Sequence, residues 1–158
     1  MTSHEHASSE TIVVGHDGSA GADRALEIAF EWGEALAAPV LVVRTWLIDY
    51  PPAKLIEDGY VLPLDEVNAR EQKSLIRHVR PLRDKHPSVP TEYRAVLGQP
   101  AEILVEIARH ARVLVVGSRG RGGFAALMLG SVSEQCVHHA TCPVLVVPRG
   151  QAGLDPSA

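Results

Sequence analysis

A glycine-rich stretch between residues 117 and 134 holds the residues of this chain best suited to bind a ligand. It reads Gly117-Ser118-Arg119-Gly120-Arg121-Gly122-Gly123, then Phe124 to Leu129, then Gly130-Ser131-Val132-Ser133-Glu134. Glycine lets the backbone come close to a ligand, so that consecutive N–H groups can converge on phosphate oxygens. A helix that begins near Ser131 adds free N–H groups and a partial positive charge at its N-terminus. The stretch therefore predicts a phosphate-binding loop.

Several side chains in this stretch can each be interpreted in two ways. Ser131 and Glu134 match the Ser-x-x-Glu capping box, so the Ser131 hydroxyl either caps its own helix or turns to a phosphate. Arg119 and Arg121 either neutralise phosphate charge or are solvent-exposed arginines of a glycine loop.

Two familiar phosphate motifs do not fit the stretch. A Walker loop needs Gly-Lys-Ser/Thr after four spacer residues, and Gly117 is followed at that distance by Gly122-Gly123-Phe124. Gly120-x-Gly122-x-x-Ala125 matches the dinucleotide fingerprint, but that fingerprint needs an acidic residue at the end of the next strand. The next strand here ends Val147-Pro148-Arg149, so we interpret the match as accidental.

Other residues with chemical potential are few. Asp17 either holds a magnesium ion through water or a ribose hydroxyl, or belongs to an Asp-Gly turn that caps a helix. Trp46 either packs in the protein or flanks an adenine ring. His4 and His6 lie in an unpatterned tail, and His138 and His139 lack a third ligand, so we expect no metal-ligand set among these four histidines. Cys136 and Cys142 are expected to be reduced, non-catalytic thiols.

Short β-branched runs alternate with segments of helical period, which is typical of βαβ units around a parallel sheet. Strands are expected over 11–14, 40–46, 91–97, 113–116 and 144–147. Helices are expected from an N-cap at Ser19 to Leu36, from about Asp65 with Leu75, Val79 and Leu82 on one apolar stripe, from Pro100, and from Ser131 to His139. Pro81 is expected to kink or end the second of these helices.

This order predicts an α/β fold: a single-domain, doubly wound, five-stranded parallel sheet with helices on both faces. The alternating pattern of residues 91–97 places that strand at one edge, and the last strand then forms the other edge. Ligands of such sheets bind beyond the carboxyl ends of the strands, which points at Asp17, Thr45 and Gly117. We expect the domain to span residues 11–148, between flexible tails at 1–10 and 149–158.

The amino-acid composition and the net charge disfavour several classes of protein. The 158 residues are 46% hydrophobic and 22% charged, values typical of one globular domain. A net charge of −4 disfavours general nucleic-acid binding, which depends on attraction to phosphates. No apolar run reaches the roughly 18 residues of a membrane span, and the N-terminus does not resemble a signal peptide. We therefore expect a cytoplasmic protein with neither nucleic acid nor membrane as a partner.

The spacing Gly117-x2-Gly120-x9-Gly130-Ser131 resembles the nucleotide-binding signature of the universal stress protein family. The likeness runs from Val14-Gly15-His16-Asp17-Gly18-Ser19 to Cys142-Pro143-Val144-Leu145-Val146-Val147-Pro148. It implies a fold like that of the adenine nucleotide alpha hydrolases, and its Gly-bearing branch binds ATP, with magnesium expected beside it. The resemblance places around the ribose and triphosphate Gly117, Gly120, Gly130, Ser131, Val132 and Ser133, with Asp17 close to the nucleotide and Thr45 giving backbone contacts to adenine. Three residues depart from the family pattern, and all of them lie outside this signature: His16, Gln99 and Pro81.

The resemblance also implies a homodimer in which two last strands pair antiparallel through Val144, Leu145, Val146 and Val147. A helix or the C-terminal tail could cover this apolar edge instead. The function expected is that of an ATP-binding regulatory or stress-response protein with no catalytic residues. The alternatives are a slow ATPase or nucleotidyl-transfer enzyme using the same pocket, and a structural partner that binds no nucleotide.

Overall fold

A computed structural model describes residues 5–48, 59, 63–120 and 129–150 of the chain. The described residues form helices and strands in the order β1 (Ile12–Gly15), α1 (Ala20–Leu36), β2 (Val40–Trp46), α3 (Leu64–Arg83), β3 (Thr91–Leu97), α4 (Pro100–Ile107), β4 (Val113–Gly117), α5 (Ser131–His139) and β5 (Val144–Val147). The five strands are parallel and lie in the order β3-β2-β1-β4-β5. This arrangement confirms the predicted doubly wound sheet, with β3 and β5 at its edges.

The order in which the chain adds strands to the sheet changes side at β1, the central strand. From β1 it proceeds to β2 and β3 on one side, and it returns to place β4 and β5 on the other side. The loops that follow β1 and β4 therefore leave the sheet in opposite directions and open a crevice between them. The residues at the carboxyl ends of these strands line this crevice.

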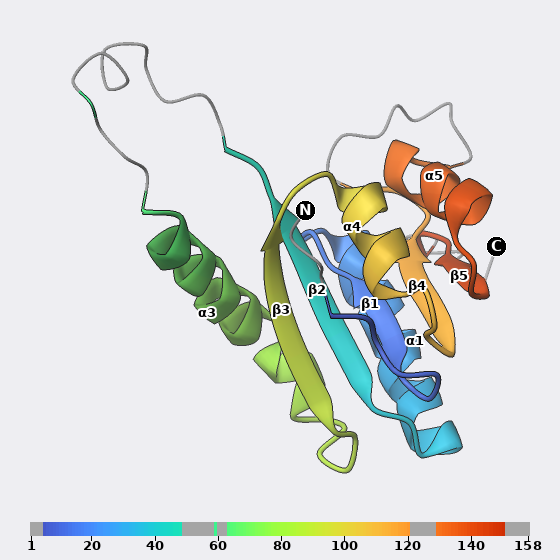
Figure 1. The fold of residues 1–158 in the computed structure, drawn as a ribbon. Coiled ribbons are helices and arrows are strands. Elements are labelled where there is room, and N and C mark those ends of the chain that lie inside the picture. Colours follow the sequence, from blue (N-terminus) through green and yellow to red (C-terminus); the bar gives the residue numbers. More distant parts are fainter. Residues whose placement is uncertain (1–4, 49–58, 60–62, 121–128, 151–158) are drawn as a thin grey trace, which may run out of the picture.

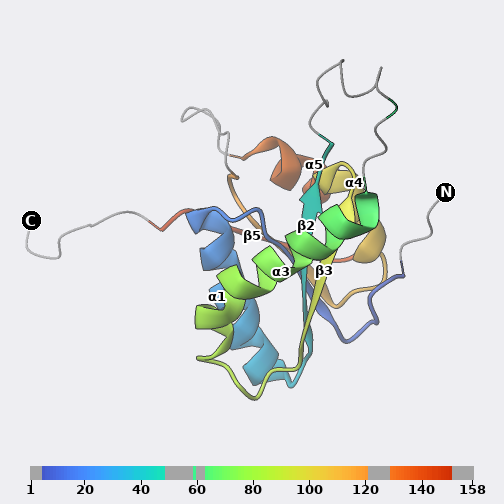
Figure 2. The same cartoon turned by 90° about the vertical axis from the view of Figure 1, so that its left-hand side faces the viewer.

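Helices cover both faces of the sheet (Figures 1 and 2). α1 and α3 pack on one face, where Phe30, Leu26 and Leu75 are fully buried against side chains of all the inner strands. α4 and α5 pack on the other face, where Ile107 and Cys136 are fully buried against β1, β2 and β4. The strands β1 and β4 are thus apolar on both sides, which explains their unbroken runs of valine, isoleucine and leucine.

Pro81 does not end the helix, so that half of the sequence-based expectation is wrong. α3 continues past Pro81 to Arg83, and Asp84 still donates its N–H to the carbonyl of Arg80 at 2.9 Å. Pro81 lies in the last turn on the exposed side of the helix. The carbonyl that loses its N–H partner can therefore bind water, which lowers the cost of proline at this position.

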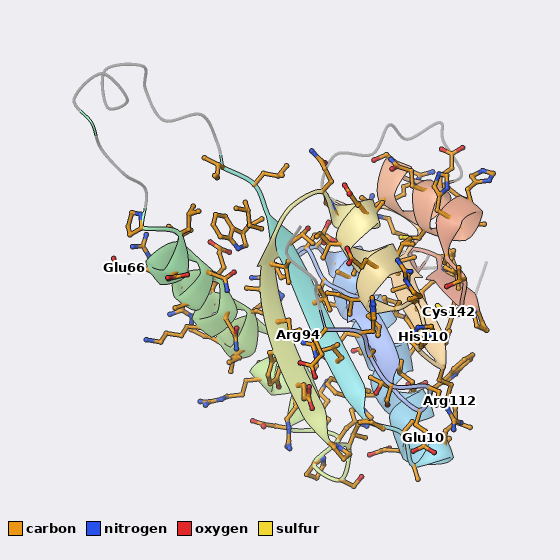
Figure 3. The ribbon with its side chains drawn as sticks, in the orientation of Figure 1. Glu10, Glu66, Arg94, His110, Arg112 and Cys142 are labelled. Carbon is orange, nitrogen blue, oxygen red and sulfur yellow. The ribbon has the colours of Figure 1, made fainter. Side chains whose placement is uncertain are left out.

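The N-terminal segment contacts the sheet and α4 before the first strand begins. Ala7 is buried and donates its N–H to the carbonyl of Ile107 at 2.9 Å. Arg94, on the outer strand β3, donates from Nη1 to the carbonyl of Glu5 (Figure 3). The ring of His6 packs edge-on against His110, with centroids 5.6 Å apart. Residues 5–10, which the sequence analysis assigned to a tail, thus take part in the packing of the domain.

The N-cap of α1 offers a test of local stability. Ser19 accepts the N–H of Ala22 at 3.2 Å, as predicted from the sequence. Replacing a serine N-cap by alanine costs about 1 kcal/mol. We expect Ser19→Ala to lower the melting temperature by about 2 to 4 °C in a domain of this size. Ser19→Asn is the matched control because asparagine caps equally well. Calorimetry that finds the same loss in both variants would contradict a capping role.

Candidate functional site

One cleft opens at the carboxyl ends of β1, β2 and β4, where the reversal of the chain predicts a ligand site. Its volume is about 700 Å³, which lies within the range of small-molecule sites. The described residues that line it include all nine positions predicted from the sequence: Asp17, Thr45, Gly117, Arg119, Gly120, Gly130, Ser131, Val132 and Ser133. Arg121 lies outside the described residues.

The loop after β4 is closed at its base by hydrogen bonds between its two ends. Gly130 donates its N–H to the carbonyl of Ser118 at 2.6 Å, and Ser118 donates its own N–H to Val147 on β5 at 2.8 Å. The buried hydroxyl of Ser133 lies 3.0 Å from the carbonyls of both Ser118 and Gly130 and donates to them. These bonds fix the start of α5 against the end of β4.

The N-terminus of α5 carries no side-chain cap. Gly130 occupies the N-cap position, and Ser131 is the first helical residue, so the expected capping box does not form. A serine inside the first turn cannot act as the cap of its own helix. The first-turn N–H groups of residues 131–133 therefore have no helical acceptor and lie at the cleft. They provide the positive end of a helix dipole to any ligand there.

The glycines of the loop allow two backbone segments to come very close. A Cβ atom on Gly117 would lie 3.0 Å from the carbonyl oxygen of Gly21 in α1. A Cβ atom on Gly120 would lie 2.6 Å from Oδ2 of Asp17. The end of β4 thus lies directly against the backbone of α1 at Gly117, whereas at Gly120 the neighbour is the end of the Asp17 side chain.

Asp17 takes the turn role that its sequence position allowed, and its carboxylate also reaches the cleft. Its Oδ1 accepts the N–H of Ser19 at 2.9 Å, which is the hydrogen bond of an Asx turn. Its Oδ2 points toward the space beside Gly120. The side chain is exposed and lines the cleft. One oxygen therefore shapes the turn while the carboxylate as a whole presents negative charge to the cleft.

His16 forms a buried polar cluster that sequence reasoning missed. Its Nε2 lies 2.9 Å from Oδ1 of Asp23, and its Nδ1 faces the N–H of Gly18 and Nη2 of Arg44, each at 3.3 Å. Burial, the dominant influence, lowers the pKa of His16, although the hydrogen bond to Asp23 opposes this shift. Arg44 also donates from Nε to the carbonyl of His16 at 3.3 Å. The unusual residue type at position 16 was the only sequence signal of this cluster.

The cleft is also lined by two residues of α3 that had no sequence signal and by Trp46, whose place at a ligand was one of two interpretations. α3 contributes Glu71 and Ser74, and the strand end contributes Trp46, whose indole Nε1 donates to Asn68 on α3 at 2.8 Å. This bond orients the indole ring at the cleft wall. The approach of Glu71 and Ser74 to the cleft depends on how α3 packs against the sheet, which local sequence patterns do not determine.

The two cysteines lie away from this chemistry. Burial raises the pKa of Cys136 to about 11, and it also raises the pKa of Cys142. Both thiols therefore stay protonated at neutral pH, which makes them poor nucleophiles.

The chain belongs to the universal stress protein family, whose model matches residues 9–148. It is 33% identical over 147 residues to universal stress protein Rv1996 of Mycobacterium tuberculosis, a match that covers 89% of this chain and 45% of that protein. The chain thus spans about half the length of the curated relatives it matches. Among the described residues, no helix is long and apolar enough to cross a membrane.

Solved structures share the fold. The universal stress protein UspA of Lactobacillus plantarum superposes with a TM-score of 0.73 at 20% identity, over 90% of this chain and 99% of that one. A universal stress protein in complex with cAMP superposes with a TM-score of 0.60 at 24% identity, over 90% and 98% of the two chains. At these identities the likeness establishes the fold.

Proposed function

We propose that the protein binds an adenine nucleotide, ATP, in the cleft and acts as a nucleotide-dependent regulatory protein of the stress response. The observation that carries this proposal is the uncapped N-terminus of α5 at the wall of the cleft. Unpartnered N–H groups at a helix start favour phosphate, and the adjoining glycines leave the space that phosphate needs. The related structure that holds cAMP supports the choice of an adenine nucleotide.

The lining residues suit the parts of such a ligand. Gly117, Gly120, Gly130 and the first turn of α5 would surround the phosphates and ribose, and Arg119 would offset phosphate charge. Thr45, at the end of β2, would contact adenine through its backbone. Asp17 offers the hard carboxylate oxygen that magnesium prefers, and the glycine beside it leaves room for the water molecules that this ion retains. Bound magnesium would supply charge neutralisation.

Identification of the bound nucleotide tests the proposal. We expect protein purified from cells to release ATP on denaturation, detected by chromatography and mass spectrometry. Equilibrium dialysis of nucleotide-free protein should then give tighter binding of ATP than of AMP or cAMP. The positive end of the helix dipole attracts a ligand more strongly when it carries more phosphate charge. Preference for cAMP would replace ATP by a cyclic nucleotide, and absence of any binding would favour the structural-partner alternative.

Slow turnover of ATP is expected because His16 and Asp17, the two groups nearest the phosphate loop that could position water, make hydrogen bonds within the protein. Both ring nitrogens of His16 are in hydrogen bonds, and Oδ1 of Asp17 accepts from Ser19. Phosphoryl transfer needs such a positioning group in addition to charge neutralisation. We expect phosphate release from magnesium-ATP well below the roughly 1 to 100 per second of kinases.

Three variants check which group is responsible if release is fast. Glu71, the carboxylate that α3 adds to the cleft, is replaced in Glu71→Gln, alongside Asp17→Ala and His16→Ala. Fast release that one of these substitutions removes would establish the slow-ATPase or transferase alternative instead of a regulatory protein.

We further propose a homodimer through β5, which pairs on one side with β4 and on its other side with no strand of the described residues. The carbonyls of Pro143 and Val147 accept from Leu114 and Ser118 at 2.9 and 2.8 Å, so these alternate residues face β4. Because backbone groups alternate along a strand, the N–H and carbonyl groups of Val144 and Val146 point away from the sheet. A second copy related by a two-fold axis would supply the matching partners.

A further inference from the structure

Three potential metal ligands converge beside, but outside, the phosphate end of the cleft. Oδ1 of Asp23 lies 2.9 Å from Nε2 of His16 and 3.0 Å from Nε2 of His78. All three atoms lie within 4.8 Å of one another, and the two imidazole rings meet edge-on with centroids 5.0 Å apart. One cation could therefore contact all three atoms after small movements.

Three separate elements hold these ligands. His16 follows β1 and its side chain is fully buried, whereas Asp23 on α1 and His78 on α3 are each 38% exposed. The cluster is thus anchored in the protein on one side and open to solvent on the other. An ion can enter from solvent without passing through the nucleotide cleft, and its fourth position would remain open to water.

We propose that His16, Asp23 and His78 form a binding site for Zn²⁺ or a similar borderline divalent cation. Two imidazole nitrogens and one carboxylate oxygen match the donor set of three-ligand zinc sites that keep one open position. Magnesium and calcium prefer sites made only of oxygen, so the two histidines select against them. Asp23 and His78 do not line the cleft, whereas His16 does, and none of the three contacts that define the site requires a bound nucleotide.

The surroundings of His16 determine how tightly the ion is held. Ligation through Nε2 moves the ring proton to Nδ1, which now faces the N–H of Gly18 and Nη2 of Arg44. Nδ1 can then no longer accept, so the contacts with the N–H of Gly18 and with Nη2 are both given up, while Arg44 can keep its bond from Nε to the carbonyl of His16. The guanidinium charge also opposes a cation, and the carboxylate of Asp23 offsets part of that repulsion. We therefore expect binding weaker than at a closed structural zinc site.

Zinc titration of the full chain, free of nucleotide and of any affinity tag, tests the site. We expect calorimetry to find one saturable Zn²⁺ site per chain and Co²⁺ to give visible absorption bands typical of a low-coordinate site. His78→Gln and Asp23→Asn should each weaken zinc binding at least tenfold. Both replace exposed side chains, and thermal melts in the presence of a chelator show whether they fold.

His86→Gln is the matched control. Nδ1 of His86, in the segment that follows α3, lies 3.1 Å from Oε1 of Glu34 on α1, so it is another histidine–carboxylate contact to α1 but without a second histidine. We expect unchanged zinc affinity in this variant. Absence of saturable binding would show that the three groups form only a hydrogen-bonded link between α1 and α3. Equal affinity in all variants would place the zinc elsewhere, and either result would overturn the proposal.

Discussion

Gly120→Glu should reduce ATP affinity more than 100-fold while the domain remains folded. A Cβ atom at this position would lie 2.6 Å from Oδ2 of Asp17, and the new carboxylate would enter the space proposed for phosphate. Repulsion between like charges and loss of the open backbone both act against the nucleotide. The Asp17 side chain is exposed and can move aside, so we expect little change in melting temperature. Titration with a fluorescent ATP analogue and a thermal melt measure the two effects.

Gly150→Glu is the control for the added charge. No atom lies within 4 Å of a Cβ atom built on Gly150, so the same substitution adds a carboxylate without a clash. This variant should bind ATP as the unmodified protein does. A folded Gly120→Glu protein with unchanged affinity would mean that the glycine loop does not hold the phosphates.

Val146→Lys should convert the proposed dimer to a monomer. Val146 lies on the open edge strand with its backbone groups directed outward, and lysine at such positions opposes edge-to-edge pairing. Two lysines would also meet across the two-fold axis. The apolar stem of lysine can cover the partly buried site of the valine while its ammonium group reaches water, so the fold should persist. Sedimentation velocity at micromolar concentration measures the change.

The exposed apolar surface beside β5 supports this choice of interface. Trp32 and Leu36 on α1 are 40% and 45% exposed and line a groove with Val144 and Leu145. Val137→Lys on α5 is the control, since Val137 is 48% exposed and lies on a helix instead of the edge strand. A wild-type monomer, or equal dissociation by both lysines, would contradict pairing through β5.

The fold could be predicted because each strand carries its own local signal. The bounds of β2, β3, β5 and α5 agree with the expected ranges, and Ser19 and Pro100 begin their helices as expected. The carboxyl ends of parallel strands meet at one edge, and that rule is sufficient to bring Asp17, Thr45 and Gly117 to one cleft.

The parts that could not be predicted depend on tertiary contacts. Asp23 and His78 are separated by 55 residues, and neither stands out on its helix. Glu71 reaches the cleft only because of the way α3 packs. Ser131 matched a capping motif, yet the backbone of Gly130 took the cap position. In each case the packing of elements that are distant in the sequence determines which residues meet, and no local pattern encodes that packing.

The bond between Gly130 and Ser118 also bears on how this site can diversify. It joins the two ends of the phosphate loop, so β4 and α5 are connected by a short path that bypasses residues 119–129. Lengthening a loop whose ends are already held costs little free energy, on the order of 0.6 kcal/mol for each doubling of its length. Insertions or replacements within the loop can therefore accumulate without displacing the helix start. Selectivity among ligands could change there while the end of α5 that we propose for phosphate is inherited unchanged.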